Sequence, residues 1–164
     1  MKGNKEMKNF TSLFHVSLFV NDIKASLDYY KKLGFEEMFG ITENEGDEPW
    51  DIYLKITHGQ YLELQPVKSN NPHPHPDDAK YYDNQTVWHF ALETQDIRTM
   101  IEDLTNKGVT VWKDPEKNGV VKSIDDVHHS EDGCLVAWLI DPDGTPIEVM
   151  EQVGQTRQRL HDPE

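Results

Sequence analysis

Residues 14–35, FHVSLFVNDIKASLDYYKKLGF, recur in altered form as residues 88–109, WHFALETQDIRTMIEDLTNKGV. Seven positions keep their residue or its chemical class at a fixed offset of 74: His15, Leu18, Asp22, Ile23, Lys24, Leu27 and Gly34 become His89, Leu92, Asp96, Ile97, Arg98, Ile101 and Gly108. A strand-like segment with a central glutamate follows each copy, with Glu63 in the first and Glu148 in the second. The chain is therefore expected to contain two copies of one structural unit.

Each copy reads as a strand, a helix and three further strands. The helix signals are an aspartate that can cap the first turn, apolar residues at helical spacing, and a glycine at the end. Apolar and β-branched runs bounded by turn residues indicate the strands. The expected strands are 13–20, 35–42, 50–57 and 60–67 in the first copy, and 86–93, 109–113, 134–140 and 145–151 in the second. The fold class expected is α+β, with two βαβββ modules.

The modules divide the chain into five parts. The expected divisions are a flexible N-terminus at 1–11, a first module at 12–67, a Pro-rich polar linker at 68–85, a second module at 86–151 and a polar tail at 152–164. The second module has 11 more residues between its histidine and its glutamate, placed around 114–133. Extra length in a surface loop leaves the strands of a module undisturbed.

The composition excludes several classes of function. The chain has 164 residues and a formal net charge of −14, which disfavours nucleic acids and anionic membrane surfaces as partners. A single cysteine, Cys134, rules out a disulfide framework within the chain. The N-terminal residues lack the apolar run of a signal peptide, so a cytoplasmic location is expected.

The two histidines and two glutamates predict a metal site. Alternate strand residues share one face, so His15 and Glu63 from one module could face His89 and Glu148 from the other. Imidazole and carboxylate ligands suit Zn²⁺, Ni²⁺, Co²⁺, Mn²⁺ or Fe²⁺, and four protein ligands leave two octahedral positions open for a substrate. Taken singly, each of the four is more often a solvent-facing or backbone-bonded strand residue than a metal ligand. His128, in the long loop, could reach the mouth of the cavity or simply be exposed.

With these residues in place, the chain resembles the vicinal oxygen chelate superfamily, of the glyoxalase I (lactoylglutathione lyase) type. The resemblance covers about residues 12–152 and rests on four motifs: HVSLFVNDI at 15–23, LEL at 62–64, HFAL at 89–92, and DPDG at 141–144 followed by IEV at 147–149. It implies a cupped mixed sheet of two βαβββ modules around one divalent metal, with Ni or Zn favoured. It also implies His15, Glu63, His89 and Glu148 as metal ligands, a small-molecule substrate, and a homodimer whose sites are in some members shared between subunits.

The resemblance also implies a chemistry. A substrate with two neighbouring oxygens would chelate the metal and pass through an enediolate, with Glu148 as the base and Glu63 as its symmetric partner. Trp138 occupies a position that lines the pocket in glyoxalases, and as a core tryptophan it would look the same. Phe19 stands where glyoxalase I has a glutathione-binding arginine, which argues against a glutathione substrate. The alternatives are an epimerase or a dioxygenase of the same superfamily, or a metal-free antibiotic-binding protein.

Overall fold

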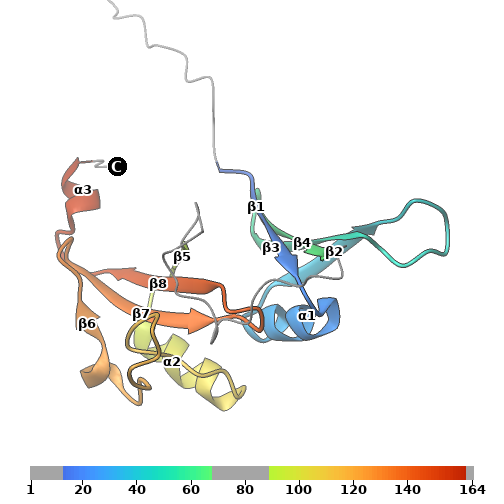
Figure 1. The fold of residues 1–164 in the computed structure, drawn as a ribbon. Coiled ribbons are helices and arrows are strands. Elements are labelled where there is room, and N and C mark those ends of the chain that lie inside the picture. Colours follow the sequence, from blue (N-terminus) through green and yellow to red (C-terminus); the bar gives the residue numbers. More distant parts are fainter. Residues whose placement is uncertain (1–12, 68–88, 162–164) are drawn as a thin grey trace, which may run out of the picture.

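The computed structural model describes residues 13–67 and 89–161. The expected N-terminal segment 1–11 and linker 68–85 lie outside the described residues. The described chain folds into two modules, each with a helix lying against a four-stranded mixed sheet (Figure 1). The expected fold class is confirmed.

The first module contains β1 (His15–Val20), α1 (Ile23–Lys32), β2 (Glu36–Ile41), β3 (Asp51–Thr57) and β4 (Gln60–Pro66). Its strand order is β1-β4-β3-β2, in which β1 and β4 are parallel and the other neighbours antiparallel. The second module contains β5 (Phe90–Glu93), α2 (Ile97–Asn106), a 3-10 turn η1 (Ile124–Asp126), β6 (His128–His129), β7 (Cys134–Ile140) and β8 (Pro146–Gln152). Its order, β5-β8-β7-β6, repeats the first. A short helix, α3 (Arg157–His161), follows β8.

The helix signals act as expected. The carboxylate of Asp22 accepts a hydrogen bond from the backbone N–H of Ala25, and Asp96 accepts one from Thr99 in the same way. Both helices end at a glycine with positive φ, +93° at Gly34 and +74° at Gly108. These are the N-cap and left-handed C-terminal positions that the repeated pattern predicts.

The strand expected at 109–113 is wrong. In the structure this segment makes isolated bridges only, through Trp112 with Val120 and with Trp138. The chain then leaves the sheet, turns through η1, and returns at β6 to provide the fourth strand next to β7. The extra residues of the second module thus form an excursion at the outer edge of the sheet, held in part by an ion pair of 2.5 Å between Lys113 Nζ and Asp126 Oδ1.

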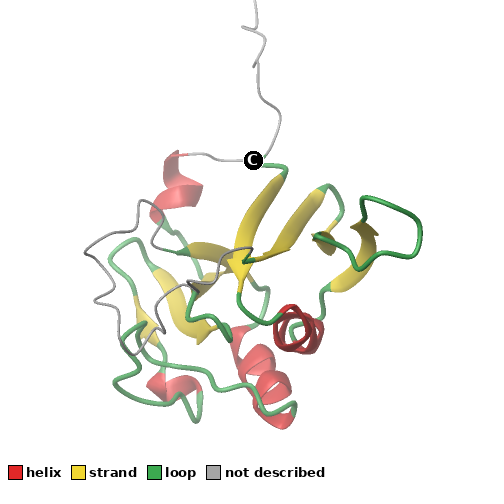
Figure 2. Ribbon diagram, turned by 45° about the vertical axis from the view of Figure 1, so that its right-hand side comes forward, coloured by secondary structure: helices red, strands yellow, loops and turns green. Residues whose placement is uncertain are grey.

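One hydrophobic core joins the two modules. It contains Leu54, Leu62 and Leu64 of the first sheet together with Ile97, Ile101, Leu104 and Ile147 of the second module. The turn between β7 and β8 lies against α1, so each module contributes to the burial of the other (Figures 1 and 2). This shared core leaves the second face of each sheet turned away from its helix. No helix in the described ranges is both long and apolar enough to span a membrane.

Candidate metal centre

Each sheet has a core face and an open face, and strand alternation decides which residues lie on each. Leu62 and Leu64 are fully buried in the core, so Glu63 between them points to the open face. Ile147 and Val149 are likewise core residues, which sends Glu148 to the open face of the second sheet. Strand alternation therefore directs both glutamates away from the core, and each of them lies beside a histidine.

The first half-site consists of His15 and Glu63. β1 and β4 run parallel, with Ser17 opposite Glu63, so His15 at the start of β1 reaches toward the middle of β4. His15 Nε2 lies 3.6 Å from Glu63 Oε2. The histidine is exposed at the sheet edge, whereas Glu63 is only 8% exposed.

The second half-site consists of His89 and Glu148. His89 Nε2 lies 3.3 Å from Glu148 Oε2, just before β5 and across from the centre of β8. Trp138 of β7 pairs in register with Glu148 and therefore lies on the same open face. Its ring meets the His89 ring edge-on, with 5.1 Å between the ring centroids. The tryptophan is buried and lies beside the second half-site.

The donor atoms of both half-sites fit a divalent metal. Two neighbouring ligands at the usual metal distances of about 2.1 Å are about 3.0–3.4 Å apart in octahedral or tetrahedral coordination. The two nitrogen–oxygen distances, 3.6 and 3.3 Å, lie at or just beyond the upper end of that range. One imidazole and one carboxylate in each half-site form the mixed donor set that suits Zn²⁺ or Ni²⁺.

The two half-sites remain two pairs within the described chain. In residues 13–67 and 89–161, no three His, Cys, Asp or Glu side chains gather in an arrangement that could hold one metal ion. His15, Glu63, His89 and Glu148 are therefore brought together two by two, and the structure does not join the four in one group.

A residue that the sequence analysis missed, Asp51, lies beside Glu63. Asp51 begins β3, is 2% exposed, and is hydrogen-bonded to Glu63. Burial and this hydrogen bond raise the pKa of Asp51 to about 6. Burial acts in the same direction on Glu63, but hydrogen bonds from Asp51, Ser17 and Gln65 and the nearby His15 outweigh it, so the pKa of Glu63 is lowered. As the pH falls through about 6, Asp51 therefore takes up a proton first, and Glu63 remains the carboxylate.

The register of the β3–β4 hairpin explains why Asp51 lies beside Glu63. Tyr53 pairs with Glu63 across the hairpin, so Asp51, two residues earlier, lies on the same face. The sequence does not reveal this pairing, because the register shifts between Lys55 and Thr57, and regular counting from the Thr57–Gln60 pair would place Leu54 opposite Glu63.

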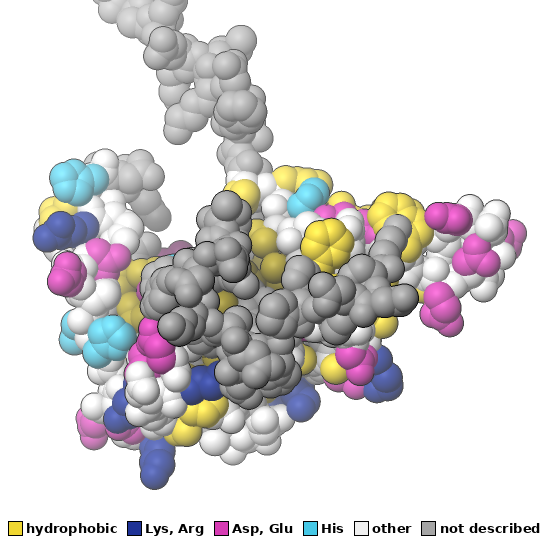
Figure 3. Space-filling model, viewed as in Figure 1, with side chains coloured by type: hydrophobic (Ala, Val, Ile, Leu, Met, Phe, Trp, Pro, Cys, Tyr) yellow, Lys and Arg dark blue, Asp and Glu magenta, His cyan; other side chains and the backbone are white. Residues whose placement is uncertain are grey.

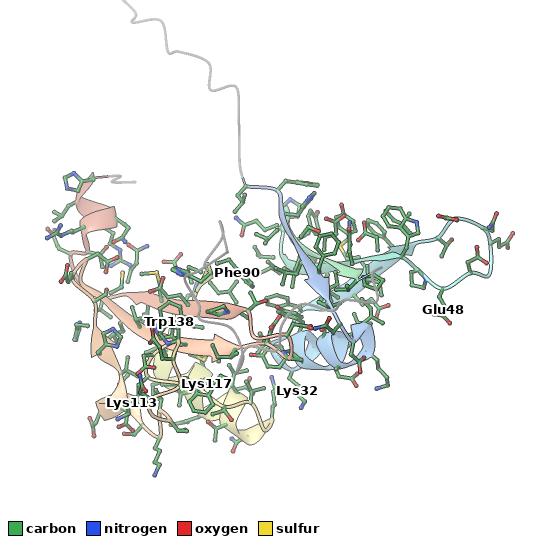
Figure 4. All side chains as sticks on the ribbon, in the orientation of Figure 1. Lys32, Glu48, Phe90, Lys113, Lys117 and Trp138 are labelled. Atoms are coloured by element: carbon green, nitrogen blue, oxygen red, sulfur yellow. The ribbon has the colours of Figure 1, made fainter. Side chains whose placement is uncertain are left out.

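The other two predicted substrate-binding residues, Phe19 and His128, lie at different distances from the half-sites. Phe19 is on the open face of β1 and 58% exposed, four residues from His15. His128 is exposed in β6, which β7 separates from β8, so its backbone is about two strand spacings, roughly 10 Å, from β8. Figure 4 shows Trp138 within the second module, at the opposite end of the molecule from Glu48 in the β2–β3 loop.

The first module exposes several large apolar side chains, of which Phe19 and Phe39 are on its open face. Those at least 48% exposed in this module are Leu13, Phe14, Phe19, Met38 and Phe39. Hydrophobic side chains are visible over this module in the space-filling view (Figure 3). A face of this kind, next to a pair of metal ligands, is unusual for a surface exposed only to solvent.

Comparison with known proteins agrees with this fold. A family model described as the Glyoxalase/Bleomycin resistance protein/Dioxygenase superfamily matches residues 12–149. No curated protein matches the chain. Among solved structures, a glyoxalase family protein from Enterococcus faecalis is 22% identical with a TM-score of 0.64, and the match covers 87% of this chain and 98% of that one.

Two further solved structures share the fold. A glyoxalase/dioxygenase from Nostoc punctiforme is 18% identical with a TM-score of 0.59, covering 89% of this chain and 94% of that one. A lactoylglutathione lyase from Agrobacterium tumefaciens is 18% identical with a TM-score of 0.57, covering 88% of this chain and 96% of that one. The repeated βαβββ modules, the two His–Glu pairs and the family match over most of the length lead to one conclusion: the chain belongs to the Glyoxalase/Bleomycin resistance protein/Dioxygenase superfamily.

Proposed function

We propose that this protein is a metal-dependent, glyoxalase-like lyase or isomerase that acts on a small substrate with neighbouring oxygen atoms. The observation that supports it most directly is the duplicated His–Glu pair, with both glutamates directed to the open faces by strand alternation. His15, Glu63, His89 and Glu148 would hold the metal, with Ni²⁺ or Zn²⁺ favoured. The metal would act as a Lewis acid that stabilises negative charge developing on the substrate oxygens.

The proton transfer is assigned to Glu148. Glu63 is restrained by hydrogen bonds from Asp51, Ser17 and Gln65, whereas the described neighbour of the Glu148 carboxylate is the imidazole of His89. A general base must move to take a proton from one carbon and return it to the next, so the less restrained carboxylate suits the role. Trp138, beside Glu148, would pack against the substrate and exclude water.

The surroundings of the first half-site argue against glutathione as the thiol carrier. Phe19 occupies the open face of β1 at the position where a cationic residue would bind a carboxylate of glutathione. Nearby, Asp51 and Glu63 add acidic groups. A neutral or apolar α-hydroxycarbonyl or α-oxo substrate therefore fits better than an anionic one.

We infer that the active form is a homodimer, in which the first half-site of one chain faces the second half-site of its partner. Each chain presents two ligands on each of two open faces, and the exposed apolar side chains lie around the first half-site. Apolar burial between two open faces would bring four ligands to each of two equivalent centres.

The experiment that tests this function combines metal content with solvent proton exchange. Purified protein should contain about one metal ion per chain, and an α-hydroxycarbonyl substrate recovered from D₂O should carry deuterium at the reacting carbon. Glu148→Gln should abolish exchange, while Glu102→Gln, on the exposed face of α2, should not change it. Protein that holds no metal under Ni²⁺ or Zn²⁺ supply, or metal-loaded protein that exchanges no proton across a panel of α-hydroxycarbonyls and thioesters, would count against the proposal.

One observation favours a second candidate, an oxygen-using dioxygenase. If the hydrogen bonds from Asp51, Ser17 and Gln65 keep Glu63 away from the metal, the remaining ligands are two histidines and one carboxylate. That set is typical of Fe²⁺ oxygenases, which need open positions for oxygen. Oxygen consumption by the Fe²⁺-loaded protein with a catechol would select this function over the isomerase.

A further inference from the structure

Two equivalent junctions connect the modules, because the repeat pairs each hairpin turn with the helix of the other module. Tyr53 pairs with Glu63 as Trp138 pairs with Glu148, so the β3–β4 and β7–β8 hairpins correspond at an offset of 85. The helices correspond at an offset of 74. Asp141 and Asp143 of one turn thus correspond to Ile56 and His58 of the other, and Tyr30 and Ser26 of α1 correspond to Leu104 and Met100 of α2.

The junction between α1 and the β7–β8 turn is closed by polar bonds. Tyr30 Oη donates to Asp141 Oδ2 at 2.8 Å, and Ser26 Oγ donates to Asp143 Oδ2 at 3.1 Å. The backbone N–H of Asn21 donates to Asp143 Oδ1 at 2.8 Å. Tyr30 and Ser26 are fully buried, so their side chains fill the centre of this junction.

The equivalent junction between α2 and the β3–β4 turn is a cavity of about 730 Å³. Its lining includes the counterparts of the residues that close the first junction, namely Gln95 for Asn21, Met100 for Ser26, Leu104 for Tyr30 and Ile56 for Asp141. Apolar side chains have replaced the hydroxyls and the carboxylate, so the hydrogen bonds that close the first junction have no equivalent here. The volume is that of a small-molecule site.

The lining of this cavity selects a type of ligand. Leu33, Phe35, Ile56 and Leu139 contribute an apolar surface. Three carboxylates, Glu93, Asp96 and Asp103, also line the cavity, and the described lining residues include no lysine, arginine or histidine. An apolar body with a positively charged group fits such a surface, in a protein whose net charge is already −14.

Glu93, the last residue of the border strand β5, is the lining carboxylate that neither caps a helix nor forms an ion pair among the described residues. Asp96 is engaged in capping α2, and Asp103 pairs with Lys107 at 2.6 Å. Glu93 accepts a hydrogen bond from the neutral side-chain amide of Gln152 at 2.9 Å, which leaves its negative charge uncompensated by that partner. His89 and Glu148 of the second half-site are not part of the cavity lining, so the cavity is a separate site.

We propose that the cavity between α2 and the β3–β4 turn is a second ligand site, which binds a small organic ammonium ion with an aromatic or aliphatic body. The apolar body occupies the space that the Tyr30–Asp141 contact fills at the other junction. The ammonium group pairs with Glu93 at the rim. This assignment does not depend on the metal centre or on the reaction proposed for it.

The test uses benzylamine as the probe, with benzyl alcohol and benzoate as neutral and anionic analogues of similar shape. Binding to the full-length protein at pH 7 is followed by protein-observed NMR titration. Benzylamine should bind more tightly than the alcohol, and benzoate should be the weakest. Glu93→Gln should weaken benzylamine roughly three- to five-fold and leave the alcohol unchanged, as expected for an exposed charge pair.

A matched pair of variants locates the site. Thr99 and Thr105 are both exposed on α2, but only Thr99 lines the cavity. Thr99→Trp should fill the space and weaken benzylamine roughly ten-fold or more, while Thr105→Trp should leave its affinity unchanged. Equal affinities for the three probes, no binding of benzylamine, or equal effects of the two tryptophan variants would overturn the proposal.

Discussion

Asp51 is the residue whose role the structure makes clearest and the sequence leaves hidden. Its buried carboxyl group is hydrogen-bonded to Glu63, and its Oδ1 atom has no hydrogen-bond partner among the described residues. Below about pH 6, a proton on Asp51 fixes the orientation of Glu63, because a protonated carboxyl can donate to a carboxylate and a second carboxylate cannot. Asp51 is thus a positioning residue for the proposed metal ligand.

Replacement of Asp51 should therefore weaken metal binding without removing a ligand. Asp51→Ala is expected to lower Zn²⁺ or Ni²⁺ affinity by about 10–100-fold, the usual effect of losing a group that orients a ligand. Asp51→Asn keeps a donor for Glu63 and should retain most of the affinity. Competition with a chromophoric chelator measures both. Unchanged affinity in Asp51→Ala would show that Glu63 is oriented by Ser17 and Gln65 alone.

At the scale of the elements, each helix depends on the glycine that ends it. Gly34 has φ +93°, and a Cβ built there would meet no atom within 4 Å. Gly34→Ala should therefore destabilise the fold by about 1 kcal/mol through backbone strain alone. Gly34→Asn should cost less, since asparagine tolerates the left-handed region. Urea unfolding of the three proteins measures the order, and an alanine variant as stable as the parent would contradict it.

The elements also show what the sequence can and cannot predict. Both helices were predictable because the signals at their ends are local: Asp22 and Asp96 at the start, Gly34 and Gly108 at the end. The strand expected at 109–113 was wrong because Val109-Thr110-Val111-Trp112 has strand composition, while its pairing depends on where a distant loop returns.

The residues of each half-site were predictable because their sequence signals are local, whereas the joining of the two half-sites into one metal centre was not. Matched positions in a duplicated unit reveal His15, Glu63, His89 and Glu148 without any knowledge of packing. The placement of one module against the other is a long-range property, decided by contacts such as Tyr30 with Asp141. Local residue patterns carry no information about how far apart the two modules place their half-sites.

At the scale of the whole molecule, the junction at Asp141 makes stability depend on pH. Burial raises the pKa of Asp141 to about 6, although hydrogen bonds from Thr145 and Tyr30 oppose the shift. Ionisation of Asp141 therefore costs folding free energy. Protonated Asp141 adds on the order of 3 kcal/mol to the free energy of unfolding. This contribution is fully present below about pH 4 and is lost as the pH rises through about 6.

An asparagine at position 141 provides the comparison, because it does not ionise. Its Oδ1 can accept from the N–H groups of Asp143 and Thr145, and its Nδ2 can donate to the Tyr30 hydroxyl oxygen. Asp141→Asn should gain stability relative to the parent protein between pH 4 and pH 7.5, as measured by urea unfolding at both values. A difference between the two proteins that does not change with pH would show that Asp141 ionises without penalty.

The proposed dimer can be tested by mixing two inactive variants. His15→Ala and His89→Ala should each lose metal binding and activity. If sites form between chains, a mixed dimer joins the intact first half-site of one chain to the intact second half-site of the other. Co-refolded mixtures should then recover about one quarter of the wild-type sites by random pairing. Recovery of none, measured by metal content and turnover, would place each site within one chain.

The outer strands of the two sheets limit how many copies of the chain can join. The outer strand β2 carries Glu36 and Glu37 and an irregular register after Glu37, and β6 is only two residues long. Charged, bulged or very short borders resist the addition of further strands. Only the inner borders, β1 and β5, are left to recruit another polypeptide. If both borders of one chain pair with the same partner, as in a two-fold dimer, none is left over and the architecture resists open-ended fibril growth.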